Sequence, residues 1–188
     1  MTDTNSSSRP EVGTESEVGP PADAAGADAA GPAADPVTAE IATAVQAGRA
    51  GDRPTARARL DDIWTRIGDG GDPFHRCVLA HYAADVQDDP HEELRWDQRA
   101  LAAADEVTEE RARAHDPSLR IAGFYPSLHL NLADVHRRLG NDADARHHLG
   151  RARARVGQLS DDGYGQMIRS GIERCGERLE HGDRSALL

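Results

Sequence analysis

The sequence predicts an all-α protein, and three observations lead to this prediction. Apolar residues recur at helical spacing between residues 124 and 139, and a glycine and a second periodic segment follow them. The same order of residues surrounds Gly51, about ninety positions earlier in the chain. Pairs of amphipathic helices joined by short turns are therefore expected.

The segment from residue 124 to residue 156 has the clearest pattern. Gly140 supplies the left-handed conformation that commonly ends a helix, and we expect Asp142 to accept a hydrogen bond from the first turn of the next helix. The apolar stripe before this turn has spacings of four, four, three and four, and consists of Phe124, Leu128, Leu132, Val135 and Leu139. The segment predicts a helical hairpin with a short, antiparallel turn.

The residues around Gly140 resemble the tetratricopeptide repeat (TPR). Ala133 stands seven positions before this glycine, and Ala145, Leu149 and Ala152 stand five, nine and twelve positions after it. The usual Trp and Tyr of the first helix are absent, with His129 and His136 near their places. The resemblance implies helical hairpins stacked as a short right-handed α-solenoid with a C-terminal capping helix.

The same offsets recur around Gly51, which indicates an internal repeat. Ala44 precedes Gly51 by seven positions, and Ala56, Leu60 and Ile63 follow it by five, nine and twelve. An unrelated helical bundle is the alternative interpretation. We expect Trp64 to pack against the next hairpin.

The middle of the chain is defined by helix caps more than by the repeat pattern. Asp72-Pro73 and Asp89-Pro90 each place a capping acid before a proline suited to the first helical turn. Two helices are expected to follow, one with a four-spaced stripe from Phe74 to Val86 and one with a stripe from Trp96 to Val107.

Asp97 breaks the pattern of the second of these helices. It aligns with Leu94 and Leu101, where a large apolar side chain is expected. We predict that Asp97 is buried with a polar partner from the preceding helix, since a buried unpaired carboxylate is costly. The candidate partners are His81, Tyr82 and His75.

These patterns divide the chain into three parts. We expect a disordered acidic tail rich in Ala, Gly and Pro at 1–36, a helical domain at 37–182 and a frayed end at 183–188. Hairpins are expected at about 37–68, 73–107 and 123–157, with the capping helix at about 161–181. The spacing of the two turn glycines leaves about 20 residues more than two repeats require, so residues 106–122 either prolong the preceding helix or form a lid-like loop.

Composition bounds the partners and the compartment. The net charge of −11 argues against nucleic acid or an anionic membrane as a partner. The chain has Arg but no Lys, which fits the codon usage of a GC-rich bacterial genome. A signal peptide and a membrane span are both missing from the sequence pattern, so we expect a cytoplasmic location. Cys77 and Cys175 are expected to be reduced.

One helix face suggests chemistry. Cys77, His81 and Asp85 follow each other at four-residue spacing, and with Asp97 they could form a nucleophile–base pair or a metal or ligand sensor. The alternative is a buried thiol and a hydrogen-bonded interior imidazole. Zinc spacings, phosphate loops and dinucleotide fingerprints are missing, so no cofactor is expected. The Arg-rich segment 146–155 is either a solvated face or an anion-binding surface.

A second polar face points to binding. Ser127, Asn131, Asp134 and Arg138 are spaced four, three and four apart, away from the apolar stripe of their helix. The TPR resemblance implies that such helices line a concave groove for extended peptides, with Asn131 and Arg138 as donors to a peptide carbonyl or carboxylate. The lysine clamp of some relatives has no counterpart, because the chain has no Lys. The expected function is an adapter or scaffold that binds a protein or peptide partner.

Overall fold

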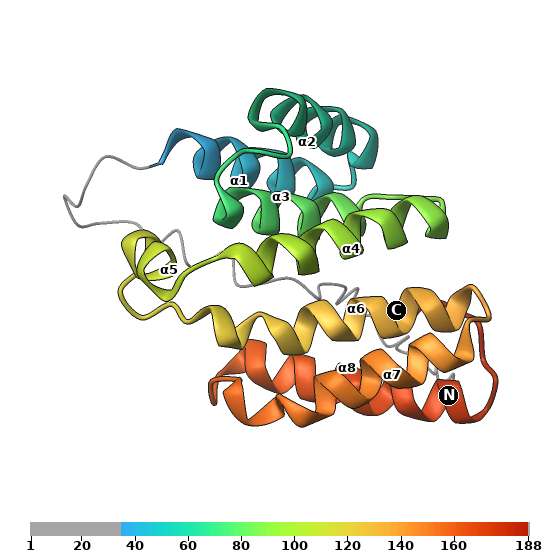
Figure 1. Cartoon of the computed structure of the whole chain (residues 1–188). Coiled ribbons are helices and arrows are strands. Elements are labelled where there is room, and N and C mark those ends of the chain that lie inside the picture. The colour runs from blue at the N-terminus through green and yellow to red at the C-terminus, as the bar shows by residue number, and fades with distance from the viewer. Residues whose placement is uncertain (1–34, 188) are drawn as a thin grey trace, which may run out of the picture.

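The computed structural model describes residues 35–187, and all regular structure in this range is helical (Figure 1). The helices are α1 (Pro36–Arg49), α2 (Arg53–Ile67), α3 (Pro73–Asp85), α4 (Pro90–Glu106), α5 (Glu109–His115), α6 (Tyr125–Arg138), α7 (Asp142–Ala154) and α8 (Gly163–Glu180). The tail expected to be disordered lies outside the described residues, except that Asp35 and Pro36 begin α1. Over residues 35–187, helices with the length and apolarity needed to cross a membrane are lacking.

Aspartates start the helices of the first half in a common way. The side chain of Asp72 accepts a hydrogen bond from the amide of His75 at 3.1 Å, and that of Asp89 accepts one from His91 at 2.9 Å, as predicted. The prediction for Asp142 is wrong, because Asn141 is the N-cap of α7 and makes no side-chain capping bond. Asp142 lies one position inside the helix, where its carboxylate meets Arg184 instead, at 2.7 Å.

The two predicted turns have the same geometry. Gly51 and Gly140 have φ angles of 88° and 82°, and the residue after each glycine donates to the carbonyl five positions earlier, at 3.0 and 2.9 Å. The matching positions of the two hairpins are all buried: Ala44, Ala56, Leu60 and Ile63 in one, and Ala133, Ala145, Leu149 and Ala152 in the other. The small residues allow α1 to pack on α2 and α6 on α7.

Successive helix pairs pack on each other in chain order. α3 pairs with α4, α2 contacts α3, α4 packs on α6, and α8 covers both α6 and α7 (Figure 1). The Trp64 ring meets the Trp96 ring of α4 edge-on, with centroids 5.1 Å apart, which confirms that Trp64 packs against the next hairpin. One apolar cluster runs from α1 to the start of α6, and a second joins α6, α7 and α8.

Residues 106–122 neither prolong α4 nor form a lid-like loop, which were the two expected alternatives, because they contain a separate short helix. Val107 is extended and ends α4, and Thr108 caps the separate short helix α5 by accepting from the amide of Arg111 at 3.1 Å. Arg111 in turn reaches Asp72 at the start of α3, at 2.6 Å. This ion pair and the buried Ala112 hold α5 beside α3.

Residues 183–187, for which fraying was expected, run back from α8 toward α6. Their backbone carbonyls accept hydrogen bonds from Arg137, whose side chain is fully buried. This arrangement places the segment at one end of a groove that α1, α3 and α6 also line.

Candidate functional site

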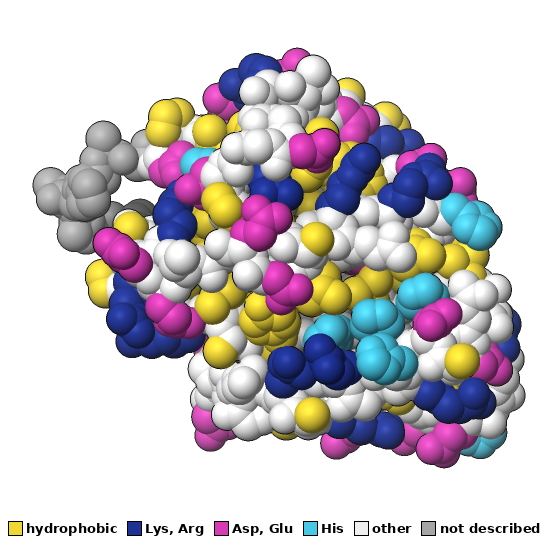
Figure 2. All heavy atoms as spheres, viewed as in Figure 1, with side chains coloured by type: hydrophobic (Ala, Val, Ile, Leu, Met, Phe, Trp, Pro, Cys, Tyr) yellow, Lys and Arg dark blue, Asp and Glu magenta, His cyan; other side chains and the backbone are white. Residues whose placement is uncertain are grey.

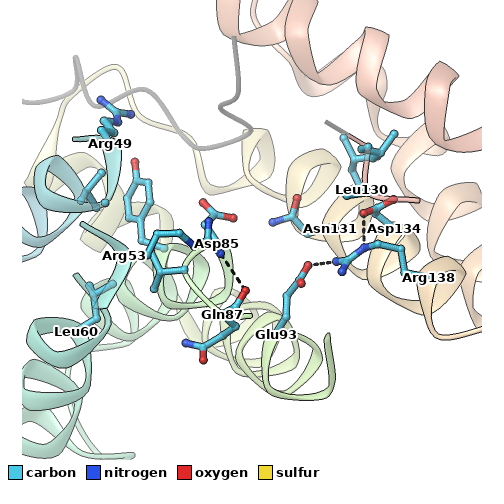
Figure 3. Close-up of a pocket in the computed structure, with 16 residues that line it drawn as sticks. Arg49, Arg53, Leu60, Asp85, Gln87, Glu93, Leu130, Asn131, Asp134 and Arg138 are labelled. Carbon is cyan, nitrogen blue, oxygen red and sulfur yellow. Dashed lines mark hydrogen bonds and ion pairs between the residues drawn. The ribbon is translucent and has the colours of Figure 1, made fainter. Parts of the chain in front are cut away.

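A groove with a volume of about 380 Å³ lies between the first hairpin, α3 and α6 (Figure 3). Apolar side chains such as Val45, Tyr82 and Leu130 line part of it. Its polar lining residues are Arg49, Arg53, Asp85, Gln87, Glu93, Asn131, Asp134 and Arg138. The groove therefore combines apolar surface with charges of both signs.

Ion pairs hold the α6 side of the groove. Arg138 contacts Glu93 of α4 and donates from Nε to Oδ2 of Asp134 at 2.9 Å (Figure 3). Burial raises the pKa of Glu93, and the charge of Arg138 opposes this shift. Burial acts against the charge of Arg138, but the two carboxylates outweigh it and raise the pKa of the guanidinium. Arg138 is therefore held in place, with two of its nitrogens already bonded.

Asn131 connects the groove to a buried polar pair. Its amide nitrogen lies 3.5 Å from Nδ1 of His81 and 3.5 Å from Oδ1 of Asp97, and both partners are 1% exposed. The prediction that Asp97 is buried is confirmed. Its hydrogen-bonding partner is Asn131 of α6, which was not among the predicted candidates, and His81 joins through the same amide.

Burial shifts the pKa values of both members of the buried pair toward their uncharged forms. Burial raises the pKa of Asp97 well above its usual range, and the nearby charges of Glu93 and Asp85 add to the shift. Burial also lowers the pKa of His81 to about 4. His81 and Asp97 thus form a hydrogen-bonded cluster around Asn131 in which burial favours the uncharged form of each side chain.

The helix face of Cys77, His81 and Asp85 is divided between two environments. Cys77 and His81 face a small cavity that Ser127 also lines, whereas Asp85 is exposed and points into the groove. Burial raises the pKa of Cys77 to about 12, so the thiol is protonated at neutral pH. Among residues 35–187, groups of three or more His, Cys, Asp or Glu side chains arranged to hold a metal ion are not found.

Three of the four predicted binding residues line the groove, and one does not. Asn131, Asp134 and Arg138 lie along it, on successive turns of α6. Ser127 is 2% exposed and donates its hydroxyl to the carbonyl of Phe124 at 2.9 Å, and it lines the small internal cavity beside Cys77 and His81 instead of the groove.

Sequence reasoning missed the contribution of the first hairpin. Arg49 ends α1 and Arg53 begins α2, so the turn at Gly51 brings two guanidinium groups to the groove. The position of Arg49 relative to the turn could have predicted its place in the groove. Arg49 stands two residues before Gly51, as Arg138 stands two residues before Gly140.

A second polar surface covers α6 and α7, where histidines lie beside arginines (Figure 2). Nδ1 of His129 is 3.1 Å from Nδ1 of His148, and the ring of His136 stacks on that of His148. Burial lowers the pKa of both His129 and His148 to about 4, and neighbouring histidines and arginines contribute. These histidines are neutral at pH 7, so the charge of this surface comes from arginines such as Arg151 and Arg155.

Comparisons with protein-family models, with curated proteins and with solved structures found no match for the chain. Residues 35–187 thus define an all-helical domain with a mixed polar and apolar groove on one side. Its function is inferred from the geometry of that groove.

Proposed function

We propose that the chain is a protein-interaction module, a TPR-like adapter that binds an extended peptide segment of a partner protein in the groove. The observation that carries this proposal is the register of the lining residues. Arg49 and Arg138 each stand two positions before a turn glycine, and Val45 and Asp134 each stand six positions before it. The groove is thus lined by the same face of two related helices, as expected for stacked hairpins.

The chemistry of the lining suits a peptide backbone. An extended segment carries N–H donors and C=O acceptors in alternation, and each needs a partner when it leaves water. Asp85 and Asn131 point into the groove from α3 and α6, where the carboxylate of Asp85 and the amide oxygen of Asn131 can accept from N–H donors of the ligand (Figure 3). Tyr82 adds apolar surface for side chains of the ligand.

The groove also fits a peptide better than a polyanion. Asp85, Glu93 and Asp134 offset the arginines of the lining, and the whole chain has a net charge of −11. The alternative chemistry at Cys77 and His81 has less support, because both side chains are buried in forms that neither attack nor carry a charge at pH 7.

A peptide-display selection on the full chain tests the proposal. We expect selected peptides to bind the parent, and the Asp85→Arg variant to bind them at least tenfold more weakly. Asp161→Arg makes the same charge change at an exposed position outside the groove, so its affinity should match that of the parent. Peptides that bind both variants equally, or the failure to enrich any peptide, would contradict the proposal.

A further inference from the structure

The segment that follows α8 occupies one end of the groove. Ala186 and Leu187 are part of the groove lining, together with Val45 and Arg49 of α1, which lie about 140 residues earlier in the chain. The side chain of Leu187 packs against the apolar cluster that contains Leu130 and Ile172. The groove thus already holds a short peptide of its own chain.

A buried arginine binds the main chain of this segment. The Arg137 side chain is fully buried, and its guanidinium donates to the carbonyls of Asp183 and Ser185, the latter at 2.6 Å. Asp134 holds the same guanidinium, accepting from Nε at 3.1 Å. The two bonded carbonyls belong to residues two positions apart in a segment that bends at Ser185, whose amide donates to Oδ1 of Asp183 at 2.8 Å. A buried charge needs such partners, so Arg137 favours a filled site over an empty one.

Other contacts to the segment also involve the main chain. Arg184 donates from Nη1 to the carbonyl of Arg137 at 2.8 Å, and its Nη2 lies 2.7 Å from Asp142. Arg178 of α8 contacts the carbonyl of Ala186. Main-chain bonds tolerate changes of side chain, so the sequence requirement falls on Arg184, which has a carboxylate partner, and on Leu187, which has an apolar one.

The segment is linked to the rest of the groove by one carboxylate. Oδ1 of Asp134 bonds Arg137, and its Oδ2 bonds Arg138, which in turn contacts Glu93. A ligand that rearranges Arg138 or Asp134 therefore acts on the residue that holds residues 183–187.

We propose that the α6–α8 end of the groove is a binding site for a short peptide segment with a basic residue and, three positions later, a leucine or similar apolar residue. Residues 183–187 of this chain are its resident occupant. The inference rests on the proposed function and specifies the ligand class. A partner segment with this pattern binds by displacing the resident segment, which competes at the high effective concentration of a tethered ligand.

The test uses the full chain and a fluorescent peptide with the sequence of residues 182–187, capped at both ends. In fluorescence polarisation we expect Leu187→Asp, which expels the resident segment, to bind the peptide at least tenfold more tightly than the parent. Ala102→Asp adds the same charge at an exposed position of α4 and should behave like the parent. A peptide that itself carries Leu187→Asp should not bind.

Circular dichroism shows whether Leu187→Asp is folded, and hydrogen exchange on the parent gives a second readout. Displacement by added peptide should reduce the protection of the amides of residues 183–187. Equal affinity of the parent and Leu187→Asp, or no binding to either, overturns the inference. A parent dimer that Leu187→Asp dissociates also overturns it, because the occupant is then a second copy. If display peptides depend on Asp85 but the 182–187 peptide does not compete with them, the proposed function stands and only this inference fails.

Discussion

Asp97 provides the most informative test of how the buried polar cluster is held. Its carboxyl is 1% exposed, one oxygen lies 3.5 Å from the amide of Asn131, and the other lacks a hydrogen-bonding partner. Replacing Asp97 by Asn keeps the shape and the acceptor but removes the titrating group. Replacing it by Ala removes the acceptor as well and leaves a void.

The expected magnitude follows from these contacts. Asp97→Ala should be less stable than Asp97→Asn by about 1–3 kcal/mol, because the amide of Asn131 loses an acceptor and the removed atoms leave a void. For a domain of this size the difference corresponds to roughly 2–4 °C in melting temperature per kcal/mol.

The pH dependence separates Asp97→Asn from the parent. The pKa of Asp97 is raised in the folded state, so below its unfolded value of 3.8 the carboxyl is protonated in both states and costs nothing. As the pH rises above 3.8, the unfolded state releases a proton that the folded state keeps, and the parent loses stability. Asp97→Asn lacks this loss and should be more stable than the parent at pH 7 and closer to it at pH 4.

Urea unfolding followed by circular dichroism at pH 4, 5.5 and 7 measures these differences, and the contributions of other groups cancel between variants. The same pH dependence in the parent and Asp97→Asn would refute the assignment of a raised pKa to Asp97. Equal stability of Asp97→Asn and Asp97→Ala would show that Asn131 does not depend on this acceptor.

Three further predictions concern packing and acid stability. Ala145→Leu should lower the free energy of unfolding by about 1–3 kcal/mol, because Ala145 of α7 is fully buried against α6. The exposed Ala143 should accept the same change. Equal effects of the two substitutions in thermal melts would contradict the hairpin register. Gly171→Ala should destabilise the protein, because the added Cβ would lie 2.7 Å from Cδ2 of Leu130 on α6. Gly150→Ala adds its Cβ in open space and should be neutral or stabilising by up to about 1 kcal/mol. A stabilising Gly171→Ala would contradict the close approach of α6 and α8. The pKa of His148 falls from 6.5 to about 4 on folding, so the unfolded state binds a proton first and the free energy of unfolding should fall as the pH is lowered from 6.5 to 4. His148→Gln should weaken this pH dependence in unfolding titrations. The same pH dependence in His148→Gln and the parent would contradict the prediction.

Much of the fold follows from local patterns in the sequence. The turn glycines and the small residues at fixed offsets placed the hairpins α1–α2 and α6–α7, and Asp-Pro pairs placed the starts of α3 and α4. Helix α5 was not predicted, because it is short and buries only Ala112, which leaves no apolar stripe to detect.

The site was predicted only where helix periodicity determines it. Spacing put Asn131, Asp134 and Arg138 on one face of α6, but it could not show that Ser127 on the same face is buried beside an internal cavity. Arg137 had no signal in the sequence, because it stands in a run of basic residues and its partners come from residues 183 and 185. Contacts between distant segments decide whether such residues are buried.

The measurement that tests the central claim most directly is NMR chemical-shift mapping of a display-selected peptide on the isotope-labelled chain. Binding in the groove predicts that the largest shifts fall on amides along its lining, including those of Arg49, Asp85 and Asn131. Shifts confined to the arginine and histidine surface of α6 and α7 around His148 and Arg151, with the groove amides unchanged, would contradict the claim that the groove binds the peptide.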